Sequence, residues 1–209
     1  MTTVVVNLYT TTNFVLLGFL SNDKQVGIYS AAYKIIILFM SIISAPLGQA
    51  LYPSIGYTFS KSYEEGIKKL YHALYIVIIL TLCSSLLILF LSKYLIFMIF
   101  GDKFKESIVT LRIMSFLPLI IGLSNVWGIQ GLLNLKKDGY VNMVTFIGAG
   151  ISLILNFLLI PVYQANGTAF SWLITEIIIT VLMLYGFVKY TDFYNDIKKY
   201  PFNFKAILR

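Results

Sequence analysis

Long apolar runs, each near or above the length of a bilayer crossing, constrain this chain more than any other feature. The stretch "ALYIVIILTLCSSLLILFLS", residues 73–92, carries no charged side chain, and about 20 such residues suffice to cross a membrane as a helix. Hydrophobic residues make up 58% of the chain and charged residues 12%, with a mean hydropathy of +0.83. A soluble domain could not cover that much apolar surface. The sequence therefore predicts an integral membrane protein.

Six apolar segments are expected to cross the membrane. The strict alternation of barrel strands is missing from them, so the expected fold class is an all-α integral membrane bundle of six transmembrane helices. The expected helices cover about 2–20, 27–56, 73–100, 107–134, 140–162 and 167–188. Residues 1–188 would form this six-helix transmembrane lobe, and residues 189–209 a basic cytoplasmic tail.

Basic residues near the helix ends predict the orientation. The net charge is +7, and the bases lie mainly between and after the apolar runs, where they meet anionic lipid headgroups rather than nucleic acid. Ten of the 16 Lys and Arg residues fall after the second, fourth and sixth helices, and five fall on the other side. Both termini are therefore expected in the cytoplasm, with the chain as a multi-pass protein of a bacterial cytoplasmic membrane.

No residue pattern indicates an enzyme. A Ser–His–Asp set and a glycine-rich phosphate loop are both missing. The single Cys83 and the single His72 do not make a metal-ligand set. We therefore expect neither catalytic residues nor a bound metal or cofactor.

Lys34 is the charged residue that most needs an explanation, because it stands inside the apolar stretch "GIYSAAYKIIILF", residues 27–39. With a helix from about 27, it would lie seven residues in, roughly 10 Å below the interface. Its long side chain could reach back to the headgroups or pair with another helix. The alternative is a water-filled cavity in which it meets an anionic substrate, beside Ser30 and with Gln49 further along.

Two other charged residues lie in or at the apolar segments. Glu176, near the middle of the last one, must be protonated or paired, and proton coupling is the functional alternative. A Lys34–Glu176 pair is compatible with their depths. Arg112 would anchor the fourth helix at the interface or meet a phosphate entering from that side.

Polar side chains inside the helices complete the predicted cavity. Thr3, Asn7, Thr10 and Thr11 share one face of the first helix, and such a stripe usually faces protein or water. Amides in the fourth helix could bond sugar hydroxyls or neighbouring helices. The predicted substrate-cavity residues are Thr3, Asn7, Thr10, Ser30, Lys34, Gln49, Arg112, Asn125 and Gln130, with Glu176 for proton coupling.

Prolines are expected to break several helices. Pro46 and Pro53 lie in the second apolar segment and Pro118 in the fourth. A proline removes one backbone hydrogen bond and kinks the helix. Kinked helices suit a transporter that rocks, although static proteins have them too.

The order of several motifs resembles one known family. The motifs are "NLYTTTNFVLLGFLSNDKQVGIYSAAYKI", "PLGQALYPSI", "FGDKFKES", "LRIMSFLPLIIGLSNVWGIQGLLNLKKD" and "PVYQANGTAFSWLITE". In this order they resemble the second half of bacterial polysaccharide flippases, the O-antigen and teichoic type exporters of lipid-linked oligosaccharides in the multidrug/oligosaccharidyl-lipid/polysaccharide superfamily. The resemblance covers nearly the whole chain.

The resemblance implies a two-lobe protein of which this chain is the C-terminal lobe. The substrate would be an undecaprenyl-diphosphate-linked oligosaccharide, moved from the cytoplasmic to the outer leaflet for surface polysaccharide synthesis. The partner would be a second six-helix lobe, either an N-terminal half or a second copy, since alternating access needs two bodies. Lys34 would then attract the anionic cargo.

Two other functions stay open from the sequence. A cation-coupled small-molecule exporter would share the fold but use acids in its cavity, and Glu176 is the one residue that favours it. A truncated remnant that no longer transports is the other alternative.

Overall fold

The computed structural model describes the backbone of residues 2–200 and the side chains of residues 10–200 except 194 and 197. The predicted cavity residues Thr3 and Asn7 therefore have side chains outside the described part. Within residues 2–200 the regular structure is entirely helical. In chain order the helices are α1 (Thr2–Leu20), α2 (Asp23–Ile42), α3 (Ser44–Lys61), α4 (Tyr63–Phe100), η1 (Asp102–Phe104), α5 (Ser107–Met114), α6 (Leu117–Asn125), η2 (Val126–Leu133), α7 (Asp138–Tyr163), α8 (Ala165–Tyr190) and α9 (Phe193–Lys199).

The described residues contain five helical stretches long and apolar enough to cross a membrane. They are α2 with α3, α4, α5 through η2, α7 and α8. The part of α1 with described side chains, Thr10–Leu20, is a shorter apolar helix. The all-α membrane fold predicted from the apolar runs is thus confirmed, with five long spans and α1 at the position of the first expected helix, about 2–20.

Prolines explain where two of the long spans are interrupted. A proline at position i cannot donate to the carbonyl of residue i−4. Ile42 is four residues before Pro46 and ends α2, with Ile43 between α2 and α3. In the same way Met114, four residues before Pro118, ends α5. The breaks expected at Pro46 and Pro118 therefore occur where a carbonyl loses its helical donor. The break expected at Pro53 does not occur, since α3 continues through that residue.

Helix α4 begins at Tyr63 rather than at about residue 73. Ser62 caps it, because its side-chain oxygen accepts a hydrogen bond from the backbone N–H of Glu65 at 3.5 Å. Ser62 and Glu65 match the spacing of a capping box, and Glu64 and Glu65 favour the positive end of the helix dipole. The charged residues between the second and third expected helices, from Glu64 to Lys69, therefore lie in the first two turns of α4.

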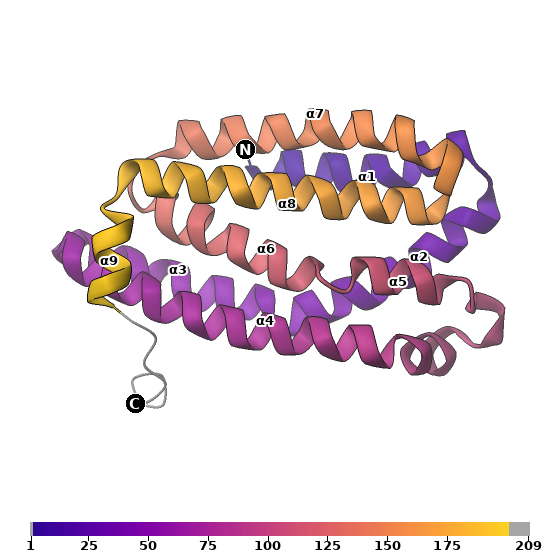
Figure 1. Ribbon diagram of the computed structural model, residues 1–209, viewed down its shortest axis with the longest axis horizontal. Coiled ribbons are helices and arrows are strands. Elements are labelled where there is room, and N and C mark those ends of the chain that lie inside the picture. Colours follow the sequence, from indigo (N-terminus) through magenta and orange to yellow (C-terminus); the bar gives the residue numbers. More distant parts are fainter. Residues whose placement is uncertain (1, 201–209) are drawn as a thin grey trace.

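Two layers of helices flank a central one. In Figure 1, α7, α1 and α8 run along one side of the bundle, α4 with α2 and α3 runs along the other, and α5, α6 and η2 lie between. Helix α6 packs on both α4 and α8, and α2 packs on α5. The stretch η2 is a π-helix, a rare wide turn that often marks a functional site.

The two ends of the bundle differ in construction. We call the end with the turns around residues 21–25, 101–106 and 163–166 the Lys24 end. The opposite end, where α9 lies across the bundle, is the α9 end (Figure 1). At the Lys24 end, Thr110 Oγ1 donates to Asn166 Oδ1 at 2.8 Å and so joins α5 to α8.

Candidate functional site

A cleft of about 210 Å³ lies inside the bundle, between α1, α2, the α6–η2 stretch, α7 and α8. Its wall is mainly apolar, with a few polar groups, which is the usual composition of a small-molecule site. It runs along the half of the bundle nearer the α9 end, since it is lined by the C-terminal half of α2 and the N-terminal part of α7. The lining residues are Thr10, Tyr33, Ile37, Met40, Ile121, Ser124, Asn125, Gly128, Ile129, Val141, Thr145, Trp172, Glu176, Ile179 and Met183.

Glu176 is the ionisable group of this cleft. It is 5% exposed, and the indole Nε1 of Trp172, one helical turn earlier, donates to its Oε1 at 3.1 Å. Thr180 Oγ1 donates to the backbone carbonyl of Glu176 at 2.7 Å. A carboxyl at this depth in a membrane helix needs such partners. The Trp172 contact holds the Glu176 side chain in one orientation at the cleft wall.

Aromatic rings close the side of the cleft between α1, α2 and α8. The Tyr33 ring centroid lies 5.5 Å from that of Trp172 and 4.9 Å from that of Phe14, with the Phe14 pair nearly perpendicular. Tyr33 is half-buried, whereas Trp172 is 2% exposed. Such pairs stabilise helix contacts beyond the area they bury, so these rings contribute to the packing of α1, α2 and α8 at this wall.

The structure brings three of the predicted residues to this cleft, namely Thr10, Asn125 and Glu176. Asn125 is half-buried at the end of α6. Ser30 is half-buried on α2 but does not line the cleft, and Gln49 is exposed on α3. The polar groups predicted as one cavity therefore divide between the cleft and the surface.

Lys34 lies further from the start of its helix than predicted. Helix α2 begins at Asp23 rather than at about 27, so Lys34 is eleven residues in, roughly 16 Å along the axis at 1.5 Å per residue. Its depth of about 10 Å below the interface stays a prediction, because the added turn carries the charged Asp23 and Lys24. Lys34 is exposed, although its neighbours Tyr33 and Ile37 line the cleft. No carboxylate among the described side chains pairs with it, so the suggested pair with Glu176 does not form.

Arg112 and Gln130 make contacts between helices outside the cleft. Arg112 is exposed on α5, and its Nε donates to Ser92 Oγ of α4 at 3.0 Å. Gln130 is buried in η2, and its Nε2 donates to the backbone carbonyl of Gly48 in α3 at 3.3 Å. Of the two roles considered for the amides of the fourth segment, Gln130 therefore has the one of bonding a neighbouring helix.

A buried polar network that sequence reasoning missed ties α1 to α7. Asn156 Nδ2 donates to Asn13 Oδ1 at 2.8 Å and to the Ser152 carbonyl at 2.8 Å. Ser171 Oγ of α8 donates to the same carbonyl at 3.2 Å. Ser152 and Asn156 are four residues apart and share a helical face, which was the available signal. Asn13 lies off the polar stripe of Thr3, Asn7 and Thr10.

Among the described side chains, residues 10–193, 195, 196 and 198–200, no group of three His, Cys, Asp or Glu residues gathers. The chemistry that the cleft offers is hydrogen bonding from short polar groups beside one buried carboxyl. This suits binding or proton exchange.

Comparisons with known proteins agree on one class. The chain is 32% identical over 184 residues to the "Putative O-antigen transporter" of Escherichia coli (strain K12), covering 87% of this chain and 44% of that protein. The protein of the same name from Shigella dysenteriae is 29% identical, with coverage of 85% and 44%. The "Capsular polysaccharide biosynthesis protein CapF" of Staphylococcus aureus is 30% identical, with coverage of 82% and 41%.

The chain thus spans less than half the length of the curated relatives it matches, which agrees with the predicted half of a two-lobe protein. No solved structure matches it significantly. A family model described as "Polysaccharide biosynthesis protein" matches residues 1–109, just over half of the chain. Together with the multi-pass helical fold, this match assigns the chain to the family of membrane-embedded polysaccharide biosynthesis proteins.

Proposed function

We propose that this chain is the C-terminal six-helix lobe of a flippase for lipid-linked oligosaccharides. The cargo is a sugar chain on undecaprenyl diphosphate, moved from the cytoplasmic to the outer leaflet of the bacterial cytoplasmic membrane. The second lobe comes from an N-terminal half or a second copy, and both termini lie in the cytoplasm. The family, the O-antigen transporter names of the relatives and the half-length match support this proposal.

The observation that carries the proposal is the position of Lys34. An exposed ammonium in the middle of an apolar helix costs about 2.5–3.5 kcal/mol in lipid. That cost disappears where the Lys34 side of α2 faces a water-filled path between two lobes. A diphosphate passing along this path would meet a fixed positive charge next to the cleft, and the attraction is stronger than in bulk water because the surroundings are apolar.

Glu176 supports a second candidate function, a cation-coupled small-molecule exporter built on the same lobe. Its carboxyl is buried at the cleft wall and bonded to Trp172. A carboxyl that gained and lost a proton there would couple transport to a proton gradient. Within the flippase proposal the same carboxyl is the proton-coupling group. The two candidate functions therefore differ in the molecule transported and not in the role of Glu176.

Export complementation tests the flippase proposal. The chain is co-expressed with a six-helix N-terminal lobe in a strain without its own flippase, and surface polysaccharide is measured. We expect export with both lobes, its loss with Lys34→Ala, and partial retention with Lys34→Arg.

The matched control is Lys93→Ala, since Lys93 is also an exposed lysine on a membrane helix, over the Phe97 ring. Unchanged export by Lys34→Ala would overturn the role of Lys34. Absence of export with both lobes inserted and stable would favour the small-molecule exporter or a remnant.

A further inference from the structure

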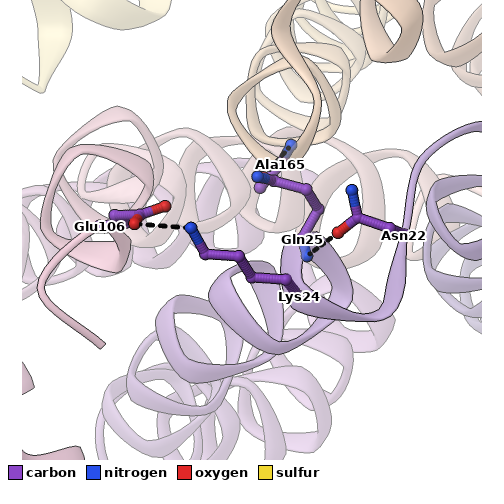
Figure 2. A network of polar contacts seen from close by, with 5 residues as sticks. All are labelled: Asn22, Lys24, Gln25, Glu106 and Ala165. Atoms are coloured by element: carbon purple, nitrogen blue, oxygen red, sulfur yellow. Dashed lines mark hydrogen bonds and ion pairs between the residues drawn. The ribbon is translucent and has the colours of Figure 1, made fainter. Parts of the chain in front are cut away.

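The Lys24 end of the bundle is tied by polar contacts between different helices. Figure 2 shows Lys24 Nζ paired with Glu106 Oε1 at 2.8 Å, which joins the start of α2 to the turn before α5. The backbone N–H of Ala165 donates to Gln25 Oε1 at 3.3 Å and joins the α7–α8 turn to α2. Three chain segments that are distant in sequence are therefore fixed to one another at this end.

The α9 end contains the least regular part of the bundle. There η2 is a π-helix that continues directly from α6, and the turn after it holds Lys136 at a positive φ of 57°. On its side toward α3, a cavity of about 20 Å³, enough for a water molecule, lies beside Gln130. The hydrogen bond from Gln130 Nε2 to the Gly48 carbonyl joins η2 to α3 beside this cavity. Helix η2 therefore borders a water-sized void on its α3 side.

Helix α9 holds η2 through an aromatic cluster. The Phe193 ring lies 5.9 Å from that of Trp127 in η2, 6.3 Å from Phe187 of α8 and 6.5 Å from Tyr71 of α4. Trp127 and Phe187 also touch each other, at 5.1 Å. Phe193 is the member of this cluster that α9 supplies, and it touches all three helices.

Polar contacts fix α9 over that cluster. Tyr75 Oη donates to the carbonyl of Tyr200 at 3.0 Å. Lys199 pairs with Glu64 in the first turn of α4, and the hydrogen bond to Glu64 raises the pKa of Lys199 above its ordinary range. Both charged groups of this pair are exposed, so it is accessible to substitution without disturbing the core.

Helix η2 connects α9 to the cleft. Trp127 packs against Phe193, while the next residues, Gly128 and Ile129, line the cleft. A Cβ on Gly128 would lie 3.1 Å from Met183 Sδ, so η2 and α8 touch closely at this wall. Any displacement of Trp127 therefore moves a wall of the cleft.

We propose that η2 is a movable wall of the cleft and that α9 is the latch that holds it closed. Release of Phe193 from its aromatic neighbours lets η2 shift toward α3 and opens the cleft at the α9 end, while the Lys24 end stays fixed. The inference deepens the proposed function, because an opening at this end would admit cargo. It does not depend on the identity of that cargo.

Thiol labelling of the purified chain in lipid nanodiscs tests the latch. Cys83 is the one cysteine, so Cys83→Ser combined with Ile129→Cys places a single thiol on the cleft wall. The rate of reaction with a water-soluble maleimide is measured. Phe193→Ala should raise it roughly tenfold, because three aromatic contacts that favour the closed state are lost together.

Further variants distinguish opening of the latch from a general loss of folding, which would also raise the labelling rate. Lys199→Glu at the exposed ion pair should raise the rate by a few-fold, and adding Glu64→Lys should return it to the starting value. Phe90→Ala, an exposed phenylalanine on α4, is the control that leaves the rate unchanged. An unchanged rate in both Phe193→Ala and Lys199→Glu overturns the latch, and so does an equal rise in Phe90→Ala. Because no export is measured, failure of the flippase proposal would leave this result intact.

Discussion

Gly167 is the position where one added methyl group should separate two helices. A Cβ there would lie 2.3 Å from the backbone oxygen of Leu159, and contacts under 3.0 Å do not occur. Because the atom in contact belongs to the backbone, no change of a side-chain rotamer can relieve the clash. Helices α7 and α8 must therefore move apart by about 0.7 Å, the difference between 3.0 and 2.3 Å. A gap of that size forfeits a quarter to a half of the dispersion energy across the contact. With the overpacking cost of about 1–3 kcal/mol, we expect Gly167→Ala to destabilise the lobe by about 2 kcal/mol.

The assay is thermal unfolding of the purified chain in detergent, followed by circular dichroism. For a chain of this length, about 2 kcal/mol corresponds to a fall in Tm of roughly 4–8 °C. Gly150→Ala is the control, because Gly150 lies in α7 with nothing within 4 Å of its Cβ position. Alanine should there leave Tm unchanged or raise it slightly, since alanine favours the helix over glycine. Equal Tm values for Gly167→Ala and the unmodified chain would refute close packing of α7 on α8.

Two further substitutions test the polar interior. Asn156→Ala should destabilise the lobe by about 1–3 kcal/mol, since Asn13 Oδ1 loses the shorter of its two hydrogen bonds and keeps only the 3.4 Å bond from Ser152 Oγ. Ile154→Ala, at an exposed position of the same helix, is the comparison in the same unfolding assay. Glu176→Gln should keep folding, because its side-chain oxygen still accepts from Trp172. If the carboxyl carries protons, the same change should abolish the dependence of export on the proton gradient, and export that stays gradient-dependent would exclude that role.

Local rules predicted two of the three proline breaks named from the sequence, and α3 continues through the third, Pro53. Pro46 and Pro118 each deprive one known carbonyl of its donor, and α2 and α5 end at those carbonyls. Helix starts were less predictable because two signals competed. The charges of "SYEEGIKK" indicate a loop by polarity, whereas Ser62 and Glu65 form a capping box. The cap determines the start of α4, since its polar turns can extend beyond the lipid.

Contacts between distant segments were outside the reach of sequence reasoning. Asn13 and Asn156 meet across 143 residues, and nothing local to either shows that α1 lies on α7. The polar stripe of α1 predicted a face toward protein or water, but the buried Asn13 lies off that stripe. Trp172 and Glu176 were the exception, because residues four apart on a helix are always neighbours. The cleft could therefore be predicted in its local pairs and not in its outline.

Lys34 is a residue for which the sequence and the structure each supply part of the argument. From the sequence, a charged Lys34 inside an apolar helix carries a free-energy cost in lipid. In the structure, no described carboxylate forms a salt bridge with Lys34 that would lower this cost. A penalty of about 2.5–3.5 kcal/mol is a sizeable part of the 5–15 kcal/mol by which a typical protein is stable. Either the ammonium reaches the headgroups, from roughly 16 Å along the helix, or α2 faces water. Tyr33 and Ile37 line the cleft, whereas Lys34 is exposed and points about 60–100° away from them around the helix. The charge therefore lies beside the cleft and not in its wall, and the flippase proposal places a hydrated path there.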